Sequence, residues 1–201
     1  MNKKQAQSEL TRKKISEAAR SLFVQKGYKA TSIEDIVAAT GSSKGNIYYH
    51  FKSKEGLFSY LLHEWDHDWL EKWQARLPSY STATSKMYGL AEQIVREDLN
   101  HPLTRAADEF FSNDEQKSEI EAKINTMIQE HLSFNRQLIQ EGVDRGEFSG
   151  EQIEQKALVL EGIVVGMSRV CRNQPLEQVL EHYRFAIDTF LYGIAAGAKR
   201  S

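Results

Sequence analysis

The stretch that decides the fold runs from residue 31 to residue 54 and reads TSIEDIVAATGSSKGNIYYHFKSK. Gly41 divides it into two short segments, 32–39 and 44–51, and both have apolar residues at helical spacing. Two short helices joined by a glycine turn are typical of the helix-turn-helix motif. We therefore expect a helix-turn-helix between about Thr31 and Phe51.

Polar residues indicate where these helices begin. Thr31 is expected to N-cap the first helix, and the Glu34 side chain is expected to return to it as the capping-box partner. Ser42 and Ser43 offer an N-cap for the second helix. Ser53 is expected to cap a longer helix that continues to about residue 77.

The remainder of the chain also predicts helices. Only three of the 201 residues are proline, and helix-forming residues dominate, so we expect an all-α fold of about nine helices. Ser149 and Gln152 are expected to form a capping box, and Pro175 is expected to begin the last helix. The other predicted helices span residues 10–26, 85–99, 103–111, 115–140, 149–170 and 176–198.

Charge divides the chain into a basic head and an acidic body. Residues 1–54 carry 11 Lys and Arg against 4 Asp and Glu, whereas residues 55–201 carry 15 against 24. This asymmetry predicts a polyanion partner for the head alone. We therefore expect a basic three-helix head at 1–54 that binds DNA or RNA, followed by an acidic helical body at 55–201.

The single cysteine, Cys171, favours a reducing compartment, and no apolar run is long enough for a signal peptide or a membrane span. The sequence therefore predicts a cytoplasmic protein that does not enter the membrane.

The segment GSSKGNIYYHFKSK at residues 41–54 resembles the recognition-helix signature of the TetR family of repressors. The resemblance continues through about residue 60, and the upstream residues that match are Phe23, Gly27, Tyr28, Thr31, Ile36 and Ala38. Further residues resemble the multidrug-binding QacR-like branch: Trp69, Trp73, His101-Pro102-Leu103 and Glu109-Phe110. The resemblance implies an all-α homodimer with a DNA-binding domain at 1–54 and a ligand-binding and dimerisation domain at 55–201, without catalysis or a cofactor.

The second helix of the motif would enter the major groove of a palindromic operator in double-stranded DNA. Lys44, Gly45 and Tyr48 are expected to face bases, because the first turn of a recognition helix meets base edges. The other expected DNA-binding residues are Ser32, Ser43, Asn46, Tyr49, His50 and Lys54, mainly towards phosphates. The alternative is structural: Lys44 solvated, Ser43 only a cap, and one tyrosine in the core.

Three tryptophans recur every fourth residue after residue 64 and share one helix face. Aromatic faces beside carboxylates suit a lipophilic cation, which is the effector we expect; plain core and a neutral or anionic apolar ligand are the alternatives. The expected ligand-binding residues are Trp65, Asp66, Trp69, Trp73, Asp98, His101, Thr104, Phe111, Met127, His131 and Phe134.

The last two helices carry wide apolar stripes and small residues that allow close approach, so they are expected to form a four-helix bundle with a second copy. A monomer whose last helix packs on its own body is the alternative. The expected dimer residues are Gly162, Gly166, Tyr183, Ile187, Phe190 and Ile194.

Two further functions remain open. His63, Glu64 and His67 fit the H-E-x-x-H pattern of zinc hydrolases, or could serve a zinc-responsive regulator. The extended zinc pattern would need Gly and His where this chain has Leu70 and Trp73. The other function is that of a DNA-binding regulator that responds to a protein or nucleoid cue.

Overall fold

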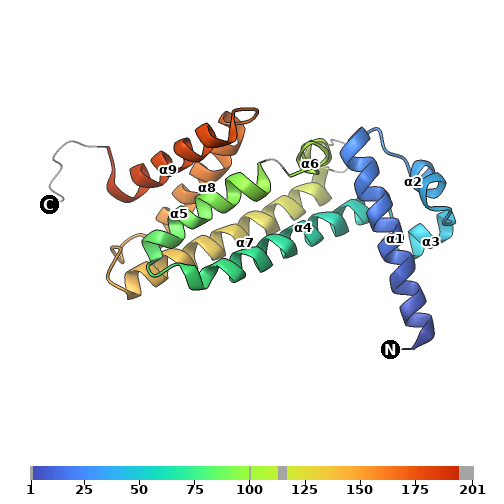
Figure 1. Ribbon diagram of the computed structural model, residues 1–201, viewed down its shortest axis with the longest axis horizontal. Coiled ribbons are helices and arrows are strands. Elements are labelled where there is room, and N and C mark those ends of the chain that lie inside the picture. Colours follow the sequence, from blue (N-terminus) through green and yellow to red (C-terminus); the bar gives the residue numbers. More distant parts are fainter. Residues whose placement is uncertain (1, 100, 113–116, 195–201) are drawn as a thin grey trace. The chain divides into compact units, whose positions relative to one another are not determined.

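The computed structural model describes residues 2–99, 101–112 and 117–194, and these ranges contain helices and no strand (Figure 1). The all-α prediction is confirmed. The helices are α1 (Lys3–Lys26), α2 (Ile33–Thr40), α3 (Lys44–Phe51), α4 (Lys54–Arg76), η1 (Leu77–Ser79), α5 (Ala83–Gln93), η2 (Ile94–Asp98), α6 (Thr104–Phe111), α7 (Lys117–Asp144), α8 (Ile153–Val170) and α9 (Leu176–Tyr192).

The chain packs as two compact units. Unit 1 comprises Met1–Glu71 with His101–Ile120, and unit 2 comprises Lys72–Asn100 with Glu121–Ser201. The division therefore falls inside α4, whereas the predicted functional domains divide after residue 54. That functional division stays a prediction.

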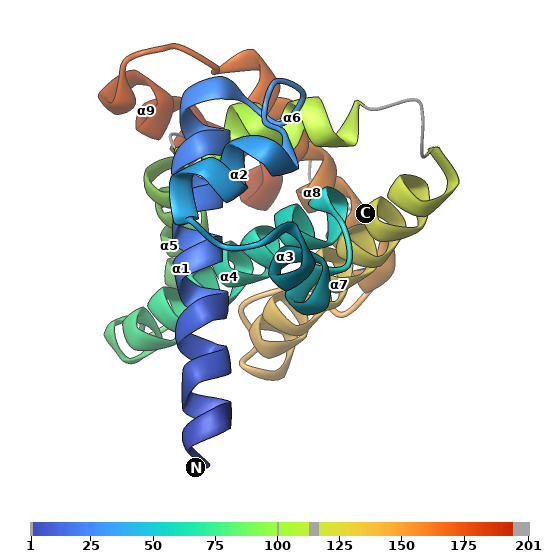
Figure 2. The same cartoon turned by 90° about the vertical axis from the view of Figure 1, so that its right-hand side faces the viewer.

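In unit 1, α2 and α3 lie against α1 (Figures 1 and 2). The core is an aromatic cluster, in which the Tyr28 ring lies 5.0 Å from the rings of both Phe58 and Phe110. Phe23 packs edge-on against Phe58 at 4.9 Å. These rings come from α1, α4, α6 and the turn after α1. Each fully buried phenylalanine stabilises the fold by about 2–3 kcal/mol.

Two helix starts in unit 1 differ from the prediction. α1 begins at Lys3 rather than near Leu10, because Asn2 and Gln5 form a capping box at its N-terminus. α2 is capped by Ser32 with Asp35 as its box partner, instead of by the expected pair one residue earlier.

The structure gives the predicted capping residue Thr31 a different role. Its side chain is buried and donates a hydrogen bond to the Gly27 carbonyl at 2.7 Å, so it cannot face the start of α2. Asp35 accepts hydrogen bonds from Lys26 and from Ser32, which hold the pKa of its carboxyl well below its usual range.

The turn between α1 and α2 depends on Gly27. Its φ is +87°, a conformation that residues with a Cβ adopt only under strain. An added Cβ would also lie 2.4 Å from a carboxylate oxygen of Glu109 on α6. That carboxylate accepts a hydrogen bond from the backbone N–H of Lys29 at 3.0 Å, so α6 is attached to the turn.

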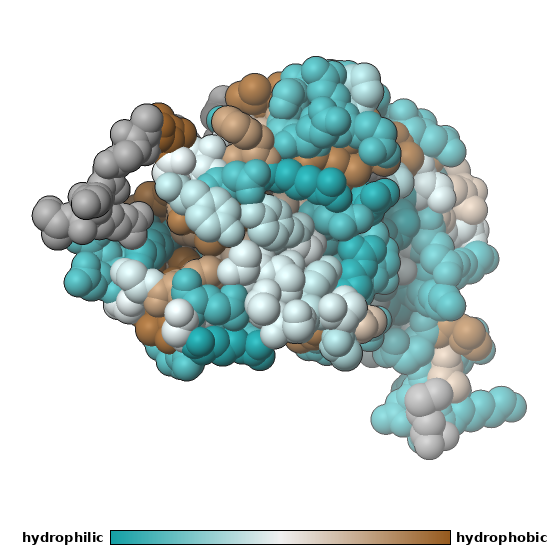
Figure 3. All heavy atoms as spheres, turned by 60° about the vertical axis from the view of Figure 1, so that its left-hand side comes forward, coloured by the Kyte–Doolittle hydropathy of each residue, from teal (hydrophilic) through white to brown (hydrophobic). Residues whose placement is uncertain are grey.

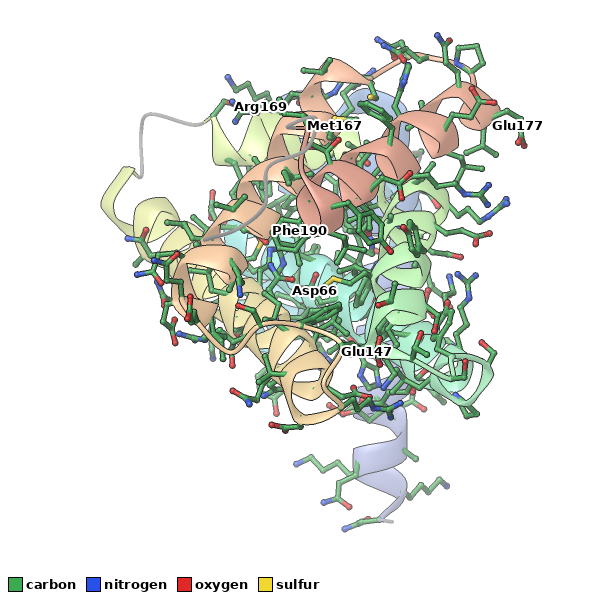
Figure 4. The ribbon with its side chains drawn as sticks, turned by 90° about the vertical axis from the view of Figure 1, so that its left-hand side faces the viewer. Asp66, Glu147, Met167, Arg169, Glu177 and Phe190 are labelled. Carbon is green, nitrogen blue, oxygen red and sulfur yellow. The ribbon has the colours of Figure 1, made fainter. Side chains whose placement is uncertain are left out.

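In unit 2, α9 packs beside α5 and α8. Glu147, labelled in Figure 4, follows α7 and caps the start of α5. Its carboxylate accepts hydrogen bonds from the backbone N–H groups of Ala83 and Thr84, both at 2.9 Å. These bonds lower the pKa of Glu147 and fix the loop after α7 to the N-terminus of α5.

The C-terminal end of α5 widens into a π-helical turn, η2. The Leu99 N–H donates to the Ile94 carbonyl five residues earlier, at 3.2 Å. Glu97 on this turn accepts hydrogen bonds from Lys72 at 2.7 Å and from Arg76 at 3.5 Å, both near the end of α4. The turn thereby anchors the last part of α4 within unit 2.

Two predictions in the C-terminal part are corrected. The expected capping box at the start of α8 is absent: Gln152 has a left-handed backbone without a side-chain cap, and the Ser149 hydroxyl accepts from Lys156 instead. α9 ends at Tyr192, where the backbone of Gly193 turns to a φ of +75°. The predicted end at residue 198 lies outside the described residues.

We expect Gly27→Ala to lower the free energy of unfolding by about 2–3 kcal/mol, because it combines a strained backbone with displacement of Glu109. Gly41→Ala is the matched control, since Gly41 has a φ of +64° and open space around it. Gly41→Ala should lower the free energy of unfolding by about 1 kcal/mol. Urea unfolding followed by circular dichroism measures both, and equal losses would contradict the role given to Glu109.

Candidate nucleic-acid interface

The α3 helix spans Lys44–Phe51, with the same bounds as the sequence predicts. Its N-cap is Ser43, whose hydroxyl accepts a hydrogen bond from the Asn46 N–H at 3.2 Å. Ile47 is fully buried and Phe51 is 5% exposed, so both pack into unit 1 as expected. Every other residue of α3 is exposed or half-buried.

The remaining face of α3 carries most of the residues that the sequence assigns to DNA. Tyr48 is 42% exposed and Tyr49 is 71% exposed. His50 is half-buried and packs edge-on against Tyr49, with ring centroids 5.0 Å apart. Gly45 and Asn46 are exposed in the first turn. The surface is therefore polar and aromatic, and its contacts to DNA stay a prediction.

The side chain of Lys44 is paired with Glu34 on α2. The Lys44 Nζ donates to Glu34 Oε1 at 2.6 Å, and the two side chains are 56% and 70% exposed. The hydrogen bond lowers the pKa of Glu34 and raises that of Lys44. The pair differs from the sequence prediction, in which Glu34 belongs to the cap of α2.

Lys54 has a structural role that the sequence did not indicate. Its Nζ donates to the carbonyls of Tyr28 and Thr31, both at 3.1 Å, and lies 4.3 Å from the centre of the Tyr28 ring. These contacts fix the first turn of α4 to the turn before α2. A contact of Lys54 with phosphate stays a prediction beside this role.

Six of the predicted ligand-binding residues belong to unit 1. Trp65 stacks on His101 with centroids 3.8 Å apart, and both line a groove of about 870 Å³ between α1 and α4. Asp66 is exposed, and Trp69 is half-buried. The other two are in α6: Thr104, which donates to the His101 carbonyl at 2.8 Å, and Phe111, which packs against Phe110.

The other five belong to unit 2. Trp73 is 5% exposed and packs edge-on against Phe134 at 5.6 Å. His131 contacts Glu161, whose carboxylate lies 3.0 Å from the His131 Nδ1. Asp98 and Met127 are half-buried. The predicted set is thus divided between the two units, and its role in ligand binding stays a prediction.

Glu161 is a buried polar residue that the sequence did not indicate. It is 8% exposed, and besides its contact with His131 it accepts a hydrogen bond from Asn135 Nδ2 at 3.1 Å. It sits among apolar residues of α8, so no local motif marked it. Its carboxylate is buried in unit 2 between these two partners.

The H-E-x-x-H residues serve other contacts. The Glu64 carboxylate accepts from Arg20 at 2.9 Å and from the Tyr60 hydroxyl at 2.7 Å. His67 pairs with Glu71 at 3.3 Å, and His63 is exposed. Within the described ranges, no group of three or more His, Cys, Asp or Glu side chains could hold a metal ion.

The predicted dimer residues also separate into two groups. Tyr183 and Ile187 are each 2% exposed and belong to the core of unit 2. Gly162 and Gly166 on α8 have open space where a Cβ would stand, and Ile194 is 86% exposed. Figure 4 shows Phe190 on α9 and Met167 on α8; both are half-buried.

Further apolar side chains on the last two helices are exposed. Figure 3 shows hydrophobic areas in brown that interrupt the hydrophilic surface. On α8 and α9 the large exposed apolar side chains are Leu158, Val159, Val165, Val170, Leu176, Phe185 and Tyr192. No helix in the described part of the chain has the length and apolarity needed to span a membrane.

Comparison with known proteins decides the family. Residues 15–61 match the sequence profile of bacterial regulatory proteins of the tetR family, and residues 65–196 match the QacR-like C-terminal region. The chain belongs to the TetR family. It is a ligand-responsive, DNA-binding transcriptional repressor, and regulators of this family bind operators and small-molecule effectors and act as dimers.

Individual relatives agree with this assignment. The HTH-type transcriptional regulator QacR of Staphylococcus aureus is 28% identical over 182 residues, which cover 90% of this chain and 97% of that protein. A TetR transcriptional regulator from Chloroflexus aurantiacus has a TM-score of 0.72 at 25% identity, covering 92% of this chain and 96% of its own. A TetR regulator from Haloarcula marismortui shares the fold alone, with a TM-score of 0.76 at 17% identity over 91% of this chain and 97% of its own.

Proposed function

We propose that α3 enters the major groove of a palindromic operator and that Lys44, Gly45 and Tyr48 face the bases. This proposal rests on the burial pattern of α3. The helix buries Ile47 and Phe51, its remaining residues are exposed or half-buried, and its N-terminus is capped. The N-termini of α2 and α3, capped by Ser32 and Ser43, would attract flanking phosphates through free N–H groups. We place this activity in the cytoplasm.

We expect Lys44→Ala to weaken operator binding by about 1–3 kcal/mol if the ammonium contacts a base. If it contacts phosphate alone, the slope of log K against log salt should fall by about one instead. Titration of a labelled operator by fluorescence anisotropy at several salt concentrations measures both quantities. Lys156→Ala, which removes the same charge from unit 2, is the control. An unchanged affinity and an unchanged slope would contradict both roles.

We also propose that two copies pair through the exposed faces of α8 and α9. Leu158, Gly162 and Val165 recur at helical spacing on α8, and the two large residues are 60% and 45% exposed. Phe185 and Tyr192, seven residues apart on α9, are 69% and 71% exposed. Two helices from each copy would bury these faces in a four-helix bundle. Recognition helices on a two-fold dimer would then meet major grooves about 34–36 Å apart.

We expect Leu158→Lys to weaken dimer formation at least tenfold, because it brings an unpaired charge into the apolar contact. Sedimentation of the purified chain over a range of concentrations measures the dissociation constant. Leu10→Lys in unit 1 is the matched control, since Leu10 is 63% exposed. If the dimers of both variants are equally stable, the exposed face of α8 does not form the dimer interface and serves another contact.

The proposed effector is a small apolar molecule, and the chemical class that we expect first is a lipophilic cation. The aromatic residues Trp73 and Phe134 lie together in unit 2, and the buried carboxylate of Glu161 belongs to the same unit. Aromatic faces and a carboxylate attract an organic cation through cation–π contact and charge pairing. A ligand releases DNA only if it binds the DNA-free state more tightly than the DNA-bound state.

Titration of the operator complex with a cationic dye is expected to release DNA, as measured by loss of anisotropy, and to quench tryptophan fluorescence. A neutral analogue and a long-chain fatty acyl compound are the comparison ligands. Release by the neutral or acyl compound alone would contradict the cationic class. Failure of all three classes would favour a protein partner or nucleoid cue.

A further inference from the structure

The Glu34–Lys44 pair joins the two helices of the helix-turn-helix. Glu34 lies in the first turn of α2, and Lys44 lies in the first turn of α3. The capping of α2 by Ser32 and Asp35 leaves the Glu34 side chain outside the capping box. Its Oε1 instead accepts from Lys44 Nζ at 2.6 Å, and neither side chain is buried.

The pair offers donors and acceptors side by side. A lysine ammonium has three N–H donors, so Lys44 retains two after its bond to Glu34. A carboxylate accepts about four hydrogen bonds, so Glu34 retains acceptor sites next to those donors. A surface that approached the pair would meet two donors followed by an acceptor.

This order matches only one kind of base pair. In the major groove a G·C pair presents two acceptors, guanine N7 and O6, followed by the amino donor of cytosine N4. An A·T pair presents an acceptor, a donor and an acceptor, which would set a donor against a donor. Guanine O6 and cytosine N4 are about 2.9 Å apart, since they hydrogen-bond to each other. That spacing is close to the 2.6 Å between Lys44 Nζ and Glu34 Oε1.

We propose that Glu34 is a specificity-determining residue and that the Glu34–Lys44 pair reads one G·C base pair in each operator half-site. Lys44 donates to guanine O6 and N7, and Glu34 accepts from cytosine N4. This inference rests on the proposed role of α3 in the major groove.

The carboxylate has a second effect on binding. A negative charge beside Lys44 repels phosphate oxygens, so it disfavours use of the ammonium as a plain backbone contact. Removal of the carboxylate should therefore strengthen binding to DNA of unrelated sequence while it weakens the choice of base. A residue that only supported the fold would change neither quantity in this opposed way.

The experiment selects bound duplexes from a randomised library with the full-length protein and sequences them. The wild type is expected to require G·C at one position of each half-site. Glu34→Ala is expected to reduce that preference about tenfold or more at this position and to leave the other positions unchanged. Glu34→Gln retains an acceptor oxygen and is expected to keep more of the preference than Glu34→Ala.

Glu17→Ala is the matched control. Glu17 is an exposed carboxylate of α1 that pairs with Lys13 at 3.8 Å, so this change removes the same charge from the same unit. It should leave the base preference intact. Thermal unfolding of each variant verifies that the fold is retained, as expected for exposed side chains.

A modified base distinguishes contacts in the major groove from contacts in the minor groove. Hypoxanthine in place of the guanine keeps N7 and O6 but lacks the minor-groove amino group, so the wild type should bind that operator normally. Retained G·C preference in Glu34→Ala, or loss of binding with hypoxanthine, would overturn the inference. A wild type that selects no sequence would instead overturn the proposed role of α3.

Discussion

Burial of the Tyr28 ring holds the helices of unit 1 together. The ring contacts Phe58 of α4 and Phe110 of α6, while the Lys54 ammonium covers it. Its hydroxyl donates to Glu55 at 3.1 Å, and burial with this neighbouring carboxylate raises the pKa of Tyr28. One side chain therefore fixes the start of α4 and the end of α6 to the turn before α2. Ile47 and Phe51 bury the inner face of α3 in the same core and leave its outer face exposed.

The sequence predicted most accurately where signals are local. The bounds of α3 follow from a glycine turn, a serine cap and two apolar residues that face inward, and none of these needs the remainder of the chain. Ser32 and Thr31 are both good N-caps, so the choice between them depends on the Gly27 carbonyl, which takes the Thr31 hydroxyl. The early start of α1 was missed because its first turns carry charges and few apolar residues.

Side-chain partners were less predictable than helices. Lys54 is basic and follows the recognition helix, which predicts a contact with phosphate. The sequence does not indicate that its ammonium also binds two backbone carbonyls, because only the folded turn presents them. Glu161 has no sequence signal, because its partners His131 and Asn135 are on another helix. The ligand-binding residues are predicted from residue type and helical spacing. Such spacing places side chains on one helix face and gives no signal of which residues line a pocket.

The π-helical turn η2 has a consequence for how related chains vary. A turn closed by a bond from residue 99 to residue 94 holds one residue more than an α-helical turn. Loss of one residue there would return the segment to ordinary α-helix and leave the residues beyond the turn facing as before. Glu97 lies within the turn, so closing it would change the direction of the carboxylate that meets Lys72 and Arg76. A change of one residue in length can thus be absorbed at this turn, but it disturbs the contact that anchors α4.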